Sequence, residues 1–524
     1  MPVDLQNFTR LYDQLFKIDL TGNVPGIRPA LSSLADVRAA TARGAPFLPL
    51  VYRQNFHEPL DAALPHVMEK LKQEVKSGQK NPAEMTTMLE SLYAGIYQHG
   101  PKVTRVNPSA ELRRFLAVVS NLFRSFVDHD KRASAGVELV TSTPPLAFFQ
   151  SDSQQGPYTI ESDLMQQHFG MSIGVVSLPA TYRDHPVIWA SLSHEVCGHD
   201  VVHADVDLLP EMIAATRGLL APSFAPRKHL DTATLNALIW SYWMDEAAAD
   251  VYGVLNMGPA FIFNLTAFLA AFRARIAVAV QRKPRPAKPV VSTEAHPRDA
   301  EHGDNKMDDH PIDILRLHLA AGAIEAMTAL NAKRRADYVA GVEALAEAVA
   351  GGAKEVTIEG IVDIGPADRI PIKAAIPLSE AAAAARQIGK MIATKHFNAL
   401  NGHSIQDIET WDDTDEAASG AIAALILKGQ SIVGHGDDAQ LLAGATLALL
   451  EQPERYAETQ SLLNDALDDS YRTDPIWGEF EADHAFAPHV FRRPHAKMKS
   501  AAARTTKRGE KKSAKTSRRG RGKR

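Results

Sequence analysis

The sequence predicts a mainly α-helical protein with a small β component, an α+β fold. Long stretches repeat apolar residues at three- and four-residue spacing, which is the period of helices that bury one face. Only the segment 172–182 and the two halves of 354–377 read as strands between turn signals. The 524 residues are 45% hydrophobic and 23% charged, which is the composition of a globular protein long enough for a sizeable core.

Residues 1–145 read as an N-terminal helical region with polar breaks. The segments 66–78 and 83–100 carry the clearest helical spacing in it. A break is predicted at 142–157. The segment 172–182 then predicts a strand that ends at a proline, and we expect it to be a short edge strand or part of a small sheet.

Three helices are predicted in the next part of the chain, from Pro186 to about 204, over 235–255 and over 260–281. The third contains the most apolar stretch of the protein, but Asn264, Arg273 and Arg275 interrupt it. Charges near the centre of a membrane-spanning helix cost about 3 kcal/mol each. We therefore expect a buried core helix and no membrane span.

The cysteine count and the N-terminus bear on the compartment. Cys197 is the single cysteine, so no intrachain disulfide can form. The first residues do not show a basic segment followed by an apolar one, which a secretory signal would have. These features predict a soluble, cytoplasmic protein.

The second half of the chain reads as a loop followed by a mostly helical region. Residues 283–310 are charged, rich in proline and poor in apolar residues, so we expect a long exposed loop. A helix is predicted from Pro311, a β-hairpin over 354–377 and further helices over 379–469. Residues 331–490 are therefore expected to form a C-terminal, mostly helical region.

The charges of the chain are divided unevenly. Of the 57 basic and 62 acidic side chains, 13 and one respectively lie in residues 497–524, which leaves 44 and 61 elsewhere. The body carries a net charge of −17 and the tail one of +12. Residues 491–524 are expected to be a disordered basic tail. Such a tail either makes non-specific contacts with polyanions or only improves solubility.

A possible metal-binding motif lies in the segment SHEVCGHDVVH, residues 193–203. Neutral imidazoles are good zinc ligands, and a glutamate beside one can act as a general base. His194 and His199 are five residues apart, which places them about 140° apart on a regular α-helix. A one-residue π-bulge would bring them together. Gly198 lies inside the required bulge, where a side chain would crowd the turn. The alternatives are two unrelated core histidines, or the pairs His194 with Cys197 and His199 with His203.

A pair of acidic residues follows in the apolar segment 235–255. Glu246 and Asp250 are four residues apart and therefore share one face of the predicted helix. Burying both carboxylates without partners would be costly. A metal ion for Glu246 and a ligand imidazole for Asp250 would compensate this cost, whereas in the alternative both side chains face water.

These motifs resemble those of the gluzincin zinc metallopeptidases. His-Glu-x-x-Gly-His is similar to the motif of the dipeptidyl peptidase III family, and Glu-x-x-Ala-Asp to that of the prenyl-protein endopeptidase and heat-shock membrane protease group. The resemblance implies that His194, His199 and Glu246 bind zinc, that Glu195 is the general base and that Asp250 holds a ligand histidine. It also implies a zincin-like catalytic domain over residues 146–330, whose strand at 172–178 pairs with substrate backbone.

A third match is His310-Pro311-x-Asp313-x-x-Arg316, which resembles a segment of the prenyl-protein endopeptidase group. The resemblance implies that His310 donates a hydrogen bond in the transition state. It implies that Arg316 supports His310 or clamps an acidic group. The alternative is a helix that simply begins at Pro311.

The sequence thus predicts a zinc-dependent metallopeptidase. A zinc-bound water would attack the peptide bond of a peptide or protein substrate, with Glu195 as general base. One alternative is a catalytically silent, metal-stabilised protein that regulates or binds a partner. Another is a zinc hydrolase that acts on a non-peptide amide.

Overall fold

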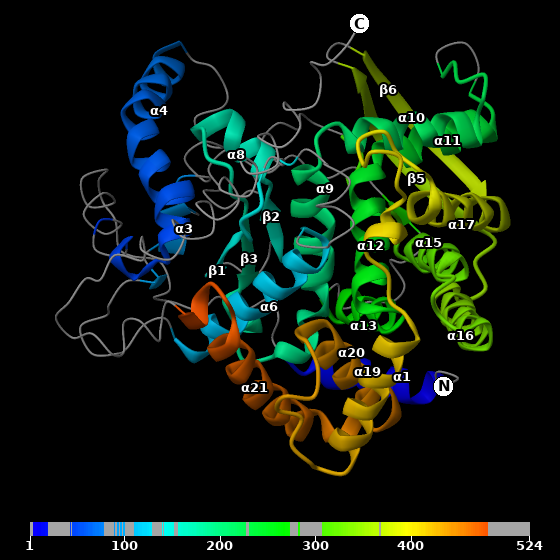
Figure 1. Cartoon of the computed structure of the whole chain (residues 1–524). Coiled ribbons are helices and arrows are strands. Elements are labelled where there is room, and N and C mark those ends of the chain that lie inside the picture. Colours follow the sequence, from blue (N-terminus) through cyan, green and yellow to red (C-terminus); the bar gives the residue numbers. More distant parts are fainter. Residues whose placement is uncertain are drawn as a thin grey trace, which may run out of the picture. The chain divides into compact units, whose positions relative to one another are not determined.

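The structure is a computed structural model. It describes residues 4–18, 45–77, 109–127, 141–150, 156–226, 230–272, 281–282, 306–365 and 368–479, and scattered positions between 42 and 139. Residues 1–477 form one compact unit, and residues 478–524 a second that lies almost entirely outside the described residues. The described elements are mostly helices with two small sheets, so the predicted mainly α fold is confirmed (Figure 1). The predicted basic tail, 491–524, lies outside the described residues.

The described N-terminal elements are helical. They are α1 (Leu5–Phe16), η1 (Ala45–Phe47), α3 (Leu50–Tyr52), the π-helix η2 (Arg53–His57), α4 (Glu58–Ser77) and α6 (Ala110–Val127). α4 contains the predicted helix 66–78, and the described positions of 83–100 are also helical. α6 buries a face that includes Phe115 and Phe123, and Arg114 joins it to Asp468 through two hydrogen bonds of 2.8 Å. Because of this face, α6 packs against both the first sheet and the helix that carries the two motif histidines.

The first sheet contains β1 (Leu146–Gln150), β2 (Tyr158–Ile160) and β3 (Val175–Pro179), in the order β1-β3-β2. β3 pairs in parallel with β1 and antiparallel with β2. The predicted strand is therefore present, but the expectation that it lies at an edge is wrong. β1 occupies one side of it, in a segment that was predicted to be a break because polar and proline-rich residues surround its short apolar core.

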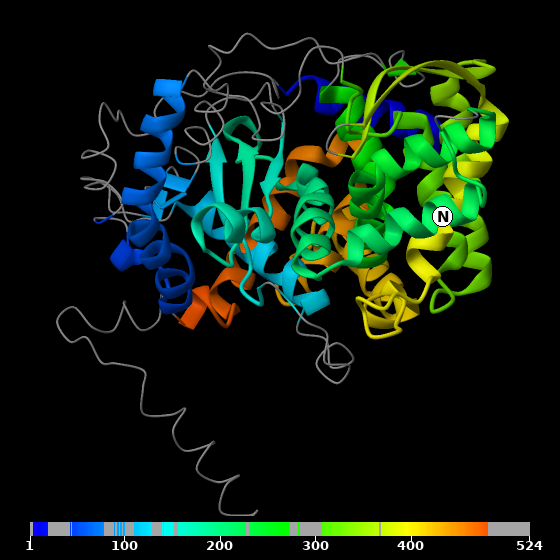
Figure 2. The same ribbon diagram turned by 90° about the horizontal axis from the view of Figure 1, so that it is seen from above.

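Six helical elements lie between and after the last two strands of this sheet along the chain. They are α8 (Ser162–Phe169), η3 (Ala180–Tyr182), η4 (Pro186–Ala190), η5 (Ser193–Asp200), α9 (Val201–Ala204) and α10 (Leu208–Leu220). The helix predicted from Pro186 is thus a 3₁₀ turn, a π-helix and a short α-helix in succession. Both views place the sheet between α4 on one side and α9 with α12 on the other (Figures 1 and 2).

The helix predicted over 235–255 is two helices, α11 (Thr232–Tyr242) and α12 (Met244–Met257), with a break at the buried Trp243. α13 (Ala260–Phe272) contains the described part of the apolar segment 260–281 and is largely buried. Gly258 separates α12 from α13 with φ 70°, and a Cβ there would lie 2.6 Å from the Trp411 ring. No helix among the described residues is long and apolar enough to cross a membrane.

The C-terminal part contains the predicted hairpin between helices. Its elements are β4 (Gln281–Arg282), α15 (Asp313–Ala326), α16 (Ala332–Ala350), β5 (Glu355–Gly365), β6 (Asp368–Pro377), α17 (Leu378–Thr394), α18 (Ile405–Ile408), α19 (Asp413–Leu427), α20 (Asp438–Glu451), η7 (Pro453–Arg455) and α21 (Tyr456–Thr473). β5 and β6 confirm the hairpin, and the two-residue β4 adds a parallel third strand.

Residues 306–310 are the described end of the predicted loop 283–310. They are buried or half-buried, although we expected the loop to be exposed. The backbone N–H of Met307 donates to the carbonyl of Ile361 at 3.0 Å, and the Met307 side chain is buried. This contact with β5 fixes the chain immediately before His310.

Helix α20 buries a carboxyl group at its first residue, Asp438. This side chain is 2% exposed, and its Oδ1 has no hydrogen-bond partner among the described residues. Burial raises the pKa of Asp438 to about 7. The nearby carboxylates of Asp437 and Asp474 contribute to this rise, whereas a hydrogen bond with Ser470 opposes it. The folded protein therefore retains this proton up to about pH 7, whereas the unfolded chain loses it near pH 4.

We predict that Asp438→Asn stabilises the protein increasingly as the pH rises from about 4 to about 8. In the wild type, the folded state binds more protons than the unfolded state in this range, so the stability that Asp438 contributes is lost as pH rises. The neutral amide removes this dependence. The difference in free energy of unfolding should grow by about 3 kcal/mol between pH 5 and pH 8, which thermal unfolding at these two pH values measures. Asp184→Asn, at an exposed carboxylate, is the control. An equal effect of Asp438→Asn at both pH values would contradict the prediction.

Candidate metal centre

The two motif histidines lie on one face of η5 because this segment is a π-helix. Ser193–Asp200 has π geometry, as the five-residue spacing predicted. Hydrogen bonds from residue i to i+5 widen the turn, so that side chains five residues apart approach each other. The Nε2 atoms of His194 and His199 lie 3.2 Å apart. The widened turn therefore supplies the geometry that a regular α-helix would not.

Gly198 is required by the neighbouring helix more than by the turn itself. A Cβ on Gly198 would lie 2.3 Å from the Cβ of Ala249 on α12, which is closer than two carbon atoms can pack. The sequence-based reason, crowding within the bulge, is incomplete because the contact that excludes a side chain comes from another helix. Gly198 and Ala249 together allow η5 and α12 to pack backbone against backbone.

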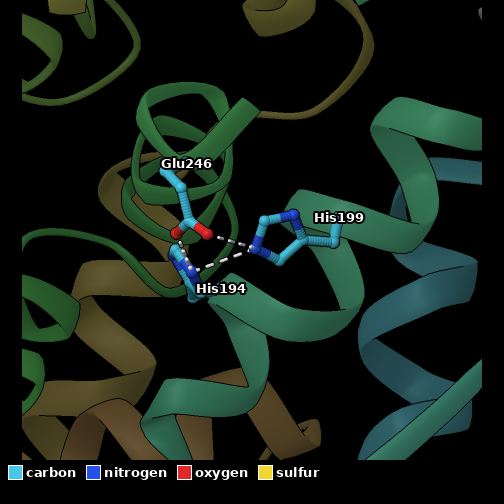
Figure 3. A group of neighbouring side chains, drawn as sticks. All are labelled: His194, His199 and Glu246. Atoms are coloured by element: carbon cyan, nitrogen blue, oxygen red, sulfur yellow. Dashed lines mark hydrogen bonds and ion pairs between the residues drawn. The ribbon is translucent and has the colours of Figure 1, made fainter. Parts of the chain in front are cut away.

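This close packing brings Glu246 to the two histidines. Glu246 Oε2 lies 3.1 Å from His194 Nε2, and Glu246 Oε1 lies 3.6 Å from His199 Nε2 (Figure 3). One ligand atom of each residue lies within 4.8 Å of the others, and all three side chains are buried. His194, His199 and Glu246 thus form a group that could hold a metal ion.

The outer nitrogen atoms of the two imidazoles determine where their lone pairs point. His194 Nδ1 lies 3.0 Å from Asp250 Oδ1, and His199 Nδ1 lies 3.2 Å from Asp245 Oδ1. A carboxylate only accepts hydrogen bonds, so each Nδ1 carries the hydrogen when the ring is neutral. Two Nε2 lone pairs then face each other and the carboxylate of Glu246. Only a cation or an added proton satisfies such a set of acceptors.

The charges around the site agree with this reading. Burial lowers the pKa of both imidazoles, but the neighbouring carboxylates outweigh it, so that the pKa of His194 is raised and that of His199 is raised well above its usual value. Burial opposes the charged form of Glu246, yet the histidines around it hold its pKa well below the usual range. Protons and a metal ion therefore compete for the same two nitrogen atoms.

Asp250 and Arg316 form a buried ion pair behind His194. Arg316 Nε donates to Asp250 Oδ2 at 2.7 Å and Arg316 Nη2 to Asp250 Oδ1 at 2.6 Å. Burial raises the pKa of Asp250, but the Arg316 guanidinium outweighs it and lowers this pKa overall. Arg316 thus clamps the carboxylate of a residue of the protein itself, Asp250. Among the described residues it contacts Asp250 and His194 rather than His310.

Helix α15, which carries Arg316, packs closely against α17 through one glycine on each helix. A Cβ on Gly322 would lie 2.1 Å from the carbonyl oxygen of Arg386 on α17. A Cβ on Gly389 of α17 would lie 1.9 Å from the carbonyl oxygen of Leu319. The two helices therefore pack so closely that no side chain fits at Gly322 or Gly389. This contact positions α15, from which the Arg316 guanidinium extends into the core.

His310 lies on the more open side of the group. Its Nε2 is 3.4 Å from Glu246 Oε1, and its Nδ1 is 3.0 Å from Asp308 Oδ1. The backbone N–H of His310 also donates to Asp308 at 3.1 Å. With 34% of its side chain exposed, His310 is more accessible than the three buried residues that could bind a metal.

Glu195 is held by a residue that the sequence analysis did not identify. The Thr159 hydroxyl lies 2.9 Å from Glu195 Oε2 and 3.0 Å from the Glu195 carbonyl oxygen. Thr159 belongs to β2, a strand that the sequence did not predict, so no local signal pointed to it. Asp245, the partner of His199, was also missed, although it directly precedes Glu246.

Among the described residues, neither of the two alternative pairs forms a metal site. The Cys197 thiol donates to the carbonyl of Leu122 at 3.2 Å, and burial raises its pKa well above the usual value, so it is an unreactive core residue. His203 does not join His199 around one ion, because its Nε2 is directed to Asp245 at 3.2 Å.

Comparisons of the chain with protein-family models, with curated proteins and with solved structures find no match.

We predict that Gly198→Ala destabilises the protein by about 1–3 kcal/mol and weakens metal binding. The added methyl group overpacks the η5–α12 contact and pushes His194 and His199 away from Glu246. Thermal unfolding and zinc titration of the metal-free protein measure the two effects. Gly218→Ala on α10 is the matched control, because its Cβ would meet nothing within 4 Å. Equal behaviour of the two variants would contradict the prediction.

We also predict that Asp250→Asn weakens metal binding about 10–100-fold. The neutral amide holds His194 less strongly and lowers the basicity of its Nε2. Competition with a chelator of known affinity measures this change. Loss of the buried charge also leaves Arg316 without its counter-ion, so the variant should unfold at a lower temperature. Zinc binding as tight as that of the wild type would contradict the assigned role of Asp250.

Proposed function

We propose that the protein is a zinc-dependent hydrolase of peptide bonds, with zinc held by His194, His199 and Glu246. The observation that carries the proposal is the convergence of two imidazole Nε2 atoms and one carboxylate, with both Nδ1 atoms tied to aspartates. Three protein ligands leave a fourth position open, which is typical of catalytic zinc sites, whereas structural sites use four. The similarity of the motifs to gluzincins supports the same activity.

The chemistry divides between the ion and the side chains around it. Zinc, when bound, lowers the pKa of a coordinated water towards neutrality and polarises a carbonyl group. Glu195 accepts the proton of the attacking water and returns it to the leaving amine. The Thr159 hydroxyl holds Oε2 of Glu195, which orients the carboxylate for this transfer.

His310 stabilises the negative charge that develops on the substrate oxygen in the transition state. Asp308 holds its Nδ1 and fixes the orientation of the ring, so that Nε2 is directed toward Glu246, where an N–H on this atom would donate a hydrogen bond to the substrate. Its partial exposure allows this contact with a substrate. Arg316 acts through Asp250 and His194 and has no direct role at the substrate.

The sheet limits how a peptide substrate can be bound. Both sides of β3 are paired, so this strand cannot bind an additional backbone. β2 is an edge strand of the described sheet, and its Thr159 contacts Glu195. A substrate backbone would therefore pair with β2, next to the general base.

We predict that Glu195→Gln abolishes hydrolysis but retains the metal. Glutamine has the same shape and can still interact with Thr159, but it cannot accept the proton, so the rate should fall at least about 1,000-fold. The wild type and the variant are incubated with a peptide library, the products are identified by mass spectrometry, and zinc per chain is measured in parallel. Glu355→Gln, at an exposed position of β5, is the control.

The same experiment separates the alternatives. Equal activity of the wild type and Glu195→Gln would contradict the role of Glu195. Metal binding without cleavage of any peptide by the wild type would favour a metal-stabilised regulatory protein. Cleavage of small amides but not of peptides would indicate a zinc hydrolase of a different substrate class.

A further inference from the structure

A second group of potential metal ligands lies beside the first. It consists of Glu161, at the junction of β2 and α8, His203 on α9 and Asp245 on α12. One ligand atom of each residue lies within 4.8 Å of the others. None of these three residues belongs to the group formed by His194, His199 and Glu246.

His203 is held in the same way as the two histidines of the first group. Its Nδ1 lies 2.9 Å from Asp163 Oδ2, and its Nε2 lies 3.2 Å from Asp245 Oδ1. The aspartate at Nδ1 again directs the Nε2 lone pair of the neutral ring towards a carboxylate. The separation of 3.2 Å is close to the distance of about 3.3 Å between two ligand atoms of a tetrahedral zinc ion.

Glu161 is placed for this group and not for its own helix. It occupies the N-cap position of α8, yet its carboxylate makes no capping hydrogen bond. The residue is 2% exposed. One of its carboxylate oxygen atoms lies within 4.8 Å of ligand atoms of His203 and Asp245.

Asp200 adds a further buried carboxylate to the same region. It is fully buried, and its Oδ1 accepts a hydrogen bond from the backbone N–H of Ser162 at 3.2 Å, next to Glu161. Its Oδ2 has no hydrogen-bond partner among the described residues. Electrostatic interactions couple it to Glu161 and His203. Asp200 thus adds a buried acidic group beside Glu161.

We propose that Glu161, His203 and Asp245 bind a second divalent cation. One imidazole and two carboxylates suit a first-row transition ion such as Zn²⁺ or Mn²⁺ better than Ca²⁺, which prefers oxygen ligands alone. The ion would join the β2–α8 junction, α9 and α12. It would stabilise the arrangement by offsetting the buried negative charge.

Asp245 connects the two sites. Its Oδ1 lies 3.2 Å from His203 Nε2 and also 3.2 Å from His199 Nδ1. A cation at the second site therefore acts on the carboxylate that orients His199. By linkage, occupation of either site changes the affinity of the other by the same factor.

The test counts metal ions in the full chain and does not depend on any hydrolytic activity. Metal-free protein is titrated separately with Zn²⁺ and with Mn²⁺, and bound metal per chain is measured after gel filtration. We expect two equivalents for the wild type with at least one of the two ions. Glu161→Gln and His203→Gln should each retain one equivalent, and Glu246→Gln should retain the other. The double variant Glu161→Gln with Glu246→Gln should bind none.

His435→Gln, at an exposed histidine of the loop before α20, is the control and should still bind two equivalents. Thermal unfolding of each metal-free variant shows whether it is folded. If His203→Gln does not fold, Glu161→Gln alone tests the second site. A single equivalent in the wild type at saturation with either ion, lost in Glu246→Gln, would overturn the proposal. So would two equivalents that persist in both Glu161→Gln and His203→Gln. Failure of the first site alone would appear as one equivalent that Glu246→Gln does not remove, which leaves the second site standing.

Discussion

The close contact between η5 and α12 at Gly198 and Ala249 is the constraint on which the rest of the site depends. It allows the two helices to approach until His194 and His199 of one face Glu246 of the other. A Cβ on Gly198 would lie 2.3 Å from the Cβ of Ala249, so a larger residue there would force the two helices apart. The π geometry of η5 then orients both imidazoles toward the same point. Packing and ligand geometry are thus fixed by the same contact.

A chain of alternating acidic and basic side chains extends from this contact through the core. It begins at Arg316, passes through Asp250 and His194 to Glu246, and continues through His199 and Asp245 to His203. Buried ions are costly unless each is paired, and here each carboxylate is placed between positively charged or protonatable partners. Because the partners are shared, a change at one end alters the charge balance at the other.

The sequence predicted the parts of this arrangement that depend on local spacing. Glu246 and Asp250 share a helix face, the interval between His194 and His199 requires a π turn, and the alternating residues of 354–377 form a hairpin. It did not predict what depends on distant neighbours. Thr159 reaches Glu195 from a three-residue strand that is too short to have a pattern of its own. β3 is central because β1 pairs with it, and the reason for Gly198 lies 51 residues away at Ala249.

Rigidity at the site comes from backbone packing rather than from large side chains. Gly198 on Ala249 holds η5 to α12, and Gly322 with Gly389 holds α15 to α17, so both layers behind His194 are fixed by backbone contacts. Burying a long polar side chain such as Arg316 costs conformational entropy. The close packing of the helix that carries Arg316 places its backbone, so that only the side chain has to be ordered. On the accessible side of the group lies His310, with one third of its side chain exposed. The buried residues that could hold a metal ion are thus the ones that close helix packing brings together, whereas the residue beside them that solvent can reach comes from the segment before α15.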